Sequence, residues 1–402
     1  MSGTGTLLDP FDLQTAISSG AVKPGDIITL RGGTYTGTFT STMTGTSENP
    51  IAVKPYPGEQ PVIDGCITIN GAYTHWRDDI EVLDSHWMDR EVAETPPVTG
   101  FVIAGAVGTH IINNYIHDTR YGIKGTNTPG CVVYGNVIGN TGYYNTATES
   151  YAGHAIYAGN LSELPSIYKH NFIYGGFFVG FHMYSDRANE LNEIQIVENV
   201  CFETGTLWDT DKYNNVGILI GGFGECVALN PVATGNWVYI KDRPLADWHY
   251  SIDIGYDAGC INPTVTGNRM CDNGYRVNTL EGHEGTVADN TLTEFGSYPE
   301  TGTEIYLQAN EYDENRTHLA ILNWALADTV AVDVSSVFVA GDTIQVKNVQ
   351  NYRTDIQELT VSEAGVLTVN MQAANRTVAT PTAWTAPATI YPQFGAFVLV
   401  KV

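Results

Sequence analysis

The sequence predicts an all-β chain whose main part is a parallel β-helix, and three observations predict it. Asn followed by a short apolar run recurs at Asn114, Asn136, Asn171, Asn199, Asn236, Asn268 and Asn290. The gaps between these asparagines are 22, 35, 28, 37, 32 and 22 residues, which is typical of a solenoid repeat with loop insertions. β-Branched and aromatic residues flank each copy without helical periodicity, so each repeat consists of short strands joined by turns.

The recurring Asn also predicts an internal ladder. Asn suits a turn that needs left-handed backbone, and its side-chain amide can bond to the same amide one coil above. We therefore expect Asn136, Asn171, Asn199 and Asn236 to stack in one internal turn, with their amides hydrogen-bonded between coils.

The chain before the coils predicts a cap and the first strands. Residues 11–19 are expected to form one short amphipathic helix, with Phe11, Leu13, Ala16 and Ile17 on one face. An open solenoid end exposes a sheet edge and apolar core, and such a helix can cover both. The first strands follow at 27–31, 51–54 and 61–69.

Three stretches carry a resemblance to a known superfamily. Residues 11–19 read FDLQTAISS, residues 24–35 read PGDIITLRGGTY, and residues 50–65 read PIAVKPYPGEQPVIDG. With these motifs, the stretch from about Pro10 to Phe295 resembles the right-handed parallel β-helix of the pectate-lyase-like superfamily. The resemblance implies that fold and its capping helix, but it leaves the activity open, because lyases, hydrolases, esterases and non-catalytic spikes share the fold.

The end of the chain predicts a second domain. We expect the β-helix to occupy residues 1–300 and a small antiparallel β-sandwich to occupy residues 303–402, with alternating strands at 319–323, 330–334, 343–349, 366–371 and 394–402. Residues 310–316 and 321–324 resemble the module that often follows a β-helix in carbohydrate-active proteins. This resemblance implies a cover for the last coil or a second sugar-binding surface.

Charge and hydropathy narrow the classes of partner. The net charge of −25 comes from 44 acidic and only 19 basic residues, which argues against nucleic acid, because phosphate neutralisation needs clustered Lys and Arg. No stretch approaches the ~18 apolar residues of a membrane span, and no signal peptide is visible. We expect a carbohydrate partner and an extracellular, cell-surface or virion-surface location. Most of the six cysteines lie in apolar strands, and we expect them to be buried free thiols. The sequence does not specify an oligomeric state.

The resemblance implies a groove beside the first strand of each coil. The loops at 139–152, 203–215 and 240–249 would form one rim, and the loop at 185–193 the other. Sugar rings need aromatic faces for stacking and acceptors for their hydroxyls. The candidate substrate-binding residues on these loops are Tyr144, Trp208, Tyr213, Trp248 and His249.

Strand alternation predicts which side chains face the groove. We align the segments that contain Ile123, Ile156, Phe181, Ile218 and Ile252, whose side chains then share the inward side. The outward row is Lys124, Tyr157, His182, Leu219, Asp253 and Glu281. The residues two positions before this row are all small, which predicts a groove floor made of Gly122, Ala155, Gly180, Gly217 and Ser251.

Two chemistries fit this row. In β-elimination, His182 or Lys124 would remove a proton, Tyr157 or Tyr184 would protonate the leaving oxygen, and Arg187 or Lys124 would neutralise the substrate carboxylate. In hydrolysis, Asp253 and Glu281 would stand one coil apart, near the 5–5.5 Å of retaining enzymes. A non-catalytic adhesin or tailspike-type protein would use the same groove only for binding.

Other polar groups are weaker candidates for metal binding or catalysis. The acidic pairs Asp78/Asp79, Asp209/Asp211 and Asp253/Asp257 make Ca²⁺ possible, although no loop has metal-site spacing. His154 and His170 are expected to be packed or turn residues rather than catalytic ones.

Overall fold

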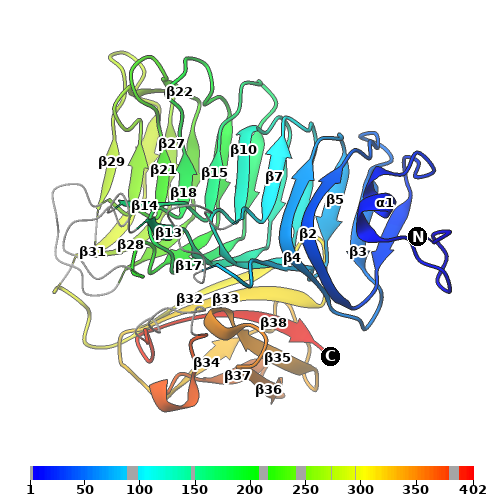
Figure 1. Ribbon diagram of the computed structural model, residues 1–402. Helices are drawn as coiled ribbons and strands as arrows, with labels where there is room; N and C mark the ends of the chain where they lie inside the picture. The colour runs from blue at the N-terminus through cyan, green and yellow to red at the C-terminus, as the bar shows by residue number, and fades with distance from the viewer. Residues whose placement is uncertain are drawn as a thin grey trace. The chain divides into compact units, whose positions relative to one another are not determined.

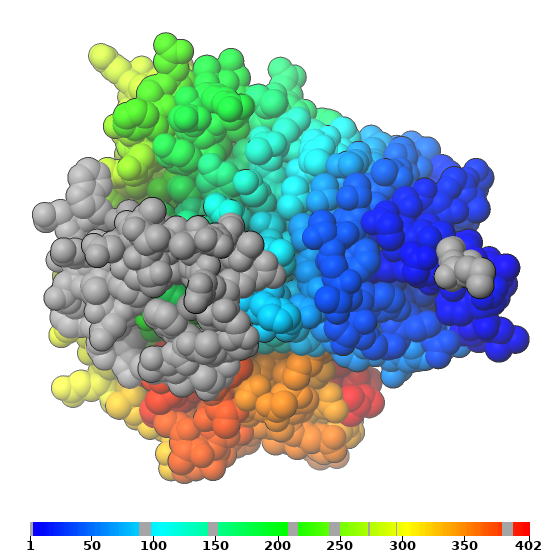
Figure 2. All heavy atoms as spheres, in the orientation of Figure 1, coloured from blue at the N-terminus to red at the C-terminus, as the bar shows by residue number. Residues whose placement is uncertain are grey.

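The computed structural model describes residues 3–87, 98–145, 150–207, 216–240, 250–272, 274–294, 296–379 and 389–402, with the backbone alone at 144–145, 150–151 and 272. The chain forms two compact units, Met1–Leu292 and Thr293–Val402. In the first unit the coils stack in chain order, so that the colour runs from blue through cyan to green along the stack (Figures 1 and 2).

One side of each coil belongs to a ten-stranded parallel sheet. In spatial order its strands are β1 (Ile27–Leu30), β3 (Ile51–Pro55), β5 (Thr74–Arg77), β8 (His110–Ile112), β11 (Val132–Tyr134), β16 (Ser166–Lys169), β19 (Ile194–Val197), β23 (Val232–Thr234), β27 (Thr264–Thr266) and β30 (Thr286–Ala288).

Seventeen further strands form the other two sides. The long strands β2 (Gly33–Ser41) and β4 (Pro61–Ile69) run across both sides, and the later strands then divide into two rows. We name the first row the groove sheet: β7 (Phe101–Ala104), β10 (Ile123–Asn127), β15 (Ile156–Ala158), β18 (Phe181–Met183), β21 (Ile218–Ile220), β25 (Ile252–Ile254) and β29 (Tyr275–Val277). We name the second row the β9 sheet: β6 (Glu81–Leu83), β9 (Tyr115–Thr119), β12 (Val137–Thr141), β17 (Phe172–Tyr174), β20 (Val200–Phe202), β24 (Trp237–Tyr239), β28 (Arg269–Asp272) and β31 (Thr291–Glu294).

The parallel β-helix predicted from the Asn repeat is therefore the observed fold. Short pairs accompany the coils: the antiparallel hairpin β13 (Tyr143–Asn145) and β14 (Ser150–Ala152), and the parallel pair β22 (Ala228–Leu229) and β26 (Cys260–Ile261).

The predicted Asn ladder is confirmed. The Oδ1 of Asn171 accepts from the backbone N–H and the side-chain amide of Asn136, both at 3.0 Å, and the same pattern links Asn171 to Asn199 and Asn199 to Asn236. The ladder extends to Asn114, Asn268 and Asn290. The left-handed conformation, however, belongs to the residue before each Asn, as at His170 with φ 55° and Glu198 with φ 52°. Asn is needed here for its amide rather than for its backbone freedom.

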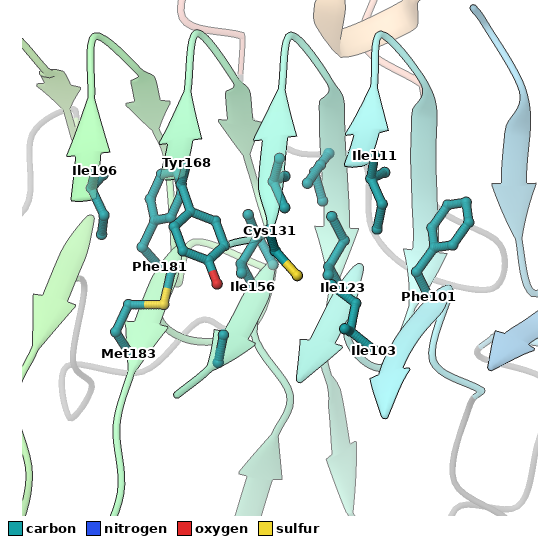
Figure 3. Close-up of a cluster of buried hydrophobic side chains, with 14 of the residues drawn as sticks. Phe101, Ile103, Ile111, Ile123, Cys131, Ile156, Tyr168, Phe181, Met183 and Ile196 are labelled. Carbon is teal, nitrogen blue, oxygen red and sulfur yellow. The ribbon is translucent and has the colours of Figure 1, made fainter. Parts of the chain in front are cut away.

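Inward side chains of the three sheets fill the centre of the coils. Phe101, Ile123, Ile156 and Phe181 of the groove sheet pair in register and are at most 1% exposed. They pack toward Ile111 and other residues of the ten-stranded sheet (Figure 3). The inward positions predicted from strand alternation are confirmed. All six cysteines are buried and free, also as predicted.

The helix α1 (Leu13–Ser18) caps the first coil, as the sequence predicted (Figure 1). Asp12 accepts from the Thr15 N–H at the helix N-terminus, and Ile17 is fully buried. The Gln14 side-chain amide donates to the Thr40 carbonyl and accepts from the Thr40 N–H. These bonds satisfy backbone groups of β2 that the open end would otherwise leave unpaired.

The second unit is a small antiparallel β module. Five strands form one sheet in the order β32 (Thr303–Ala309), β33 (Arg316–Asn323), β38 (Phe394–Lys401), β35 (Thr343–Asn348) and β36 (Ile356–Thr360). A second sheet pairs β34 (Thr329–Asp333) with β37 (Val366–Asn370), and two 3₁₀ turns occur at Val349–Asn351 and Ala373–Asn375. Within the described parts of the whole chain, no helix has the length and apolar character needed to cross a membrane.

Candidate functional site

Outward side chains of the groove sheet form one continuous row. From coil to coil its members are Val102, Lys124, Tyr157, His182, Leu219, Asp253 and Arg276. The register of Lys124 through Asp253 is the expected one. The prediction that Glu281 is the neighbour of Asp253 is wrong. Arg276 occupies that position, and Glu281 lies in an exposed turn after β29. The chain returns from β25 to β29 after fewer residues than we predicted, so Asp253 and Glu281 do not form the predicted carboxylate pair.

The small residues before these strands do not form the groove floor. A Cβ at Gly180 would lie 2.6 Å from Cys201 Sγ, and one at Gly217 would lie 2.7 Å from Val238 Cγ1. Both neighbours belong to the interior, so this row points inward and permits close packing against the β9 sheet. The prediction of an exposed floor of small residues is wrong, because strict alternation does not hold at the corner where the chain enters each strand.

The residue directly before each small corner residue faces the groove instead. These residues are Tyr121, His154, Val179, Val216 and Tyr250. The ring of Tyr121 lies 5.7 Å from that of Tyr157, and Val179 and Val216 line the groove pocket. His154, predicted to be a packed or turn residue, is buried as expected, but it also bonds to His182 and therefore belongs to the site. Its position before a corner residue was the signal that could have identified it.

His154 and His182 form a hydrogen-bonded pair at the centre of the site. His182 Nδ1 lies 2.8 Å from His154 Nε2. Tyr157 and Tyr184 both contact His182, with ring centroids 5.3 Å and 5.0 Å from the imidazole centroid, and Tyr184 is stacked on the imidazole. Phe178 contacts His154 at 5.0 Å. Packed rings thus fix the orientation of both imidazoles.

A pocket of about 540 Å³ opens beside this pair. Its lining combines apolar faces with a few polar tips: Phe178, Val179, His182, Tyr184, Val216, Leu219, Asp253 and Tyr256. This composition is that of a small-molecule or sugar site, in which a small number of polar groups orient a ligand against apolar walls.

Asp253 lines the pocket and forms an ion pair. Arg276 donates to both of its oxygens, at 2.9 and 2.6 Å. The guanidinium of Arg276 in turn lies over the Tyr250 ring, 4.9 Å from its centroid. Burial raises the pKa of the Asp253 carboxyl, and the hydrogen bonds from Arg276 oppose that effect. Among the described lining residues Asp253 is the single carboxylate, so these residues supply no second member of a hydrolytic pair.

Burial sets the protonation states of the central groups. It lowers the pKa of His182 to about 3 and holds the pKa of His154 well below its usual range. Burial also raises the pKa of the Tyr157 and Tyr184 phenols. At neutral pH the site therefore holds two neutral imidazoles, which share one N–H between them, and two protonated phenols.

The remaining predicted site residues lie away from the histidine pair or outside the described residues. Arg187 lies in the loop after β18; its side chain is 79% exposed and 3.9 Å from Glu190. Tyr144 lies in β13, with only its backbone described. The candidates Trp208, Tyr213, Trp248 and His249, and the acidic pair Asp209/Asp211, lie outside the described residues. Across the described ranges, no group of three or more His, Cys, Asp or Glu is placed to hold a metal ion.

Comparison with known proteins finds similar solved structures but no matching sequence or family model. No protein-family model and no curated protein sequence matches the chain. Among solved structures, the chain is similar to pectate lyase Pel9A, with 14% identity over 72% of this chain and 73% of that chain and a TM-score of 0.46. It is also similar to a rhamnogalacturonan lyase, with 12% identity over 72% of this chain and 84% of that chain and a TM-score of 0.41. XylC in complex with xylose has 10% identity over 100% of this chain and 98% of that chain, with a TM-score of 0.40. The parallel β-helix that the sequence motifs predicted is established by the strand pairing of this chain itself.

Proposed function

We propose that the protein binds a polysaccharide along the groove sheet and cleaves it by β-elimination, with His182 as the base. The observation that carries the proposal is the His154–His182 pair, whose His182 member lines a pocket together with aromatic rings. Aromatic faces stack on sugar rings, and phenol and imidazole tips can bond their hydroxyls. Such a polymer would be met outside the cell or at a cell or virion surface.

A neutral His182 can accept a proton as soon as substrate binds. When His182 donates its Nδ1–H to His154, its Nε2 keeps a free lone pair, and Nε2 makes no hydrogen bond to a described residue. With its pKa lowered to about 3 by burial, His182 by itself is a weak base. A substrate carboxylate beside the ring would raise that pKa, because a nearby negative charge favours the imidazolium.

The general acid, which protonates the leaving oxygen, is Tyr157 or Tyr184. His182 removes the proton on the carbon next to the carboxylate, and the C–H electron pair becomes a carbon–carbon double bond. The glycosidic C–O bond breaks at the adjacent carbon, and the departing oxygen takes a proton from the phenol. The raised pKa of both phenols keeps that proton in place until the oxygen becomes strongly basic.

The test is a panel of polysaccharides. Unsaturated products are followed by ultraviolet absorbance and new chain ends by a reducing-end assay. Unsaturated ends support the proposal, and saturated ends alone contradict it. Binding without products would identify a non-catalytic adhesin.

Single substitutions then assign the acid. Tyr157→Phe and Tyr184→Phe keep the stacking ring and remove the proton donor. The variant that loses activity marks the acid, and the other serves as its matched control.

A further inference from the structure

Two cations lie around one tyrosine ring at the edge of the candidate site. Arg120 Cζ is 5.1 Å from the Tyr121 ring centroid, and Lys124 Nζ is 5.4 Å from the same centroid. Arg120 also lies 5.5 Å from the ring of Tyr143, in the β13 hairpin, and Lys124 lies 6.0 Å from Tyr157. Aromatic rings thus hold both cations without neutralising them.

Neither cation has an acidic partner among the described residues, although the chain carries 44 acidic and 19 basic residues. The Nε of Arg120 is buried and makes no hydrogen bond to any described residue. Other cations of this protein are paired: Arg31 with Glu59, and Arg276 with Asp253. A buried donor without an acceptor carries a desolvation cost, which a bound anion would offset.

The same two cations lie beside the histidine pair. The ring of Tyr121, which carries both, is 5.9 Å from that of His154. Burial is the main cause of the low pKa of His154, and the positive charge of Arg120 lowers it further. Of the two cations that the sequence suggested for a substrate carboxylate, Lys124 lies here, whereas the Arg187 side chain is 79% exposed.

We propose that Arg120 and Lys124 bind the carboxylate of a uronic acid unit, so that the substrate is an acidic polysaccharide. The inference rests on the proposed function, because elimination needs a proton next to a carboxylate. As that proton leaves, negative charge develops on the carboxylate oxygens. Two fixed cations stabilise the charge, and the planar guanidinium of Arg120 can bond both oxygens.

The test measures binding separately from turnover. Calorimetry on the His182→Ala variant compares oligogalacturonate and oligomannuronate with their carboxyl-reduced forms. We expect at least one acidic form to bind tenfold or more tightly than its reduced counterpart. Arg120→Met and Lys124→Met, each added to His182→Ala, should weaken acidic binding by about tenfold to a hundredfold, the effect of a lost charge-assisted hydrogen bond. Binding of the reduced form should not change.

The matched control is Arg31→Met, because Arg31 also lies over a tyrosine ring, 5.2 Å from the centroid of Tyr56, but pairs with Glu59. It should leave the preference for the acidic form intact. If Arg120→Met does not fold, Arg120→Lys keeps the charge and should retain part of the preference, and Lys124→Met still decides the question.

Equal affinity for acidic and reduced chains, no binding of any acidic chain, or a preference that survives loss of the cations would each overturn the inference. Selective binding without unsaturated products from the wild-type protein would instead refute the proposed elimination and leave the carboxylate subsite standing. Unsaturated products from the wild-type protein, together with an unchanged preference for the acidic chain in the Arg120 and Lys124 variants, would support the elimination and refute the carboxylate subsite.

Discussion

His117 and His182 lie on neighbouring sheets of the same β-helix, yet their surroundings move their proton affinities in opposite directions. Burial alone would lower the pKa of His117, but its hydrogen bonds to Asp118 and Glu81, both at 3.1 Å, raise it to about 9. His182 has another imidazole and aromatic rings around it, and burial lowers its pKa to about 3.

The difference shows what each environment is suited to do. A histidine held between two carboxylates stays protonated at neutral pH and acts as the centre of an ion cluster. A histidine held by rings and a neutral imidazole stays unprotonated and keeps a lone pair for chemistry. Partners rather than the parallel sheet therefore decide which histidine can be a base, and four experiments test that comparison.

The largest expected effect is the loss of the base. His182→Ala should lower turnover at least a hundredfold on the polysaccharide identified by the panel, as expected for a missing general base. The measurement is the initial rate of unsaturated product. His182→Asn is the matched control, since its amide can still bond His154 while offering no base. Full activity in either variant would refute the role of His182.

The second effect concerns stability at alkaline pH. The folded pKa of His117 lies above its unfolded value of about 6.5, so its contribution is fully present below that pH and is lost as pH rises toward 9. His117→Gln should remove about 2 kcal/mol of stability at pH 6 and much less at pH 9.5, in denaturant titrations. A cost that does not vary with pH would show that His117 is neutral in the folded protein.

The third effect concerns His154 as a positioning residue. His154→Phe keeps the ring contact with Phe178 and removes the bond to His182, so activity should fall about tenfold, the size of one neutral hydrogen bond. His154→Gln, whose amide can replace Nε2, should restore much of it. The distinguishing readout is the pH profile of kcat/KM, whose acidic limb should shift in the Phe variant; an unchanged profile would leave His154 with a packing role.

The smallest effect concerns acid stability. His154 and His182 have folded pKa values below 6.5, so the unfolded chain binds more protons and stability falls as pH drops below about 6.5. His75 and His110, stacked at 4.0 Å with pKa values of about 3 and 4, act in the same direction. His182→Asn should therefore lower the acid-unfolding midpoint by only about half a pH unit, because the other groups remain. The midpoint is measured by circular dichroism, and a rise would contradict this account.

The sequence determined the features that depend on local periodicity or on one repeated side chain. The Asn repeat specifies the ladder, because a buried amide in every coil has its best partner in the next one. Alternation within three-residue strands predicts which residues face inward, as at Ile156 and Phe181, and which face outward, as at Tyr157 and His182.

Only the tertiary structure decided the features that depend on corners and coil lengths. At a corner the alternation starts again, so Gly180 points inward and His154 reaches His182, against the expectation from spacing. The length of the last coil puts Arg276 rather than Glu281 beside Asp253. Arg120 lies over its sequence neighbour Tyr121, but it meets Tyr143 only because two segments of the coils pack together. Neighbours along the chain set the pattern of each strand, but contacts between coils set which charges and rings meet, and those contacts join residues that the sequence holds more than twenty positions apart.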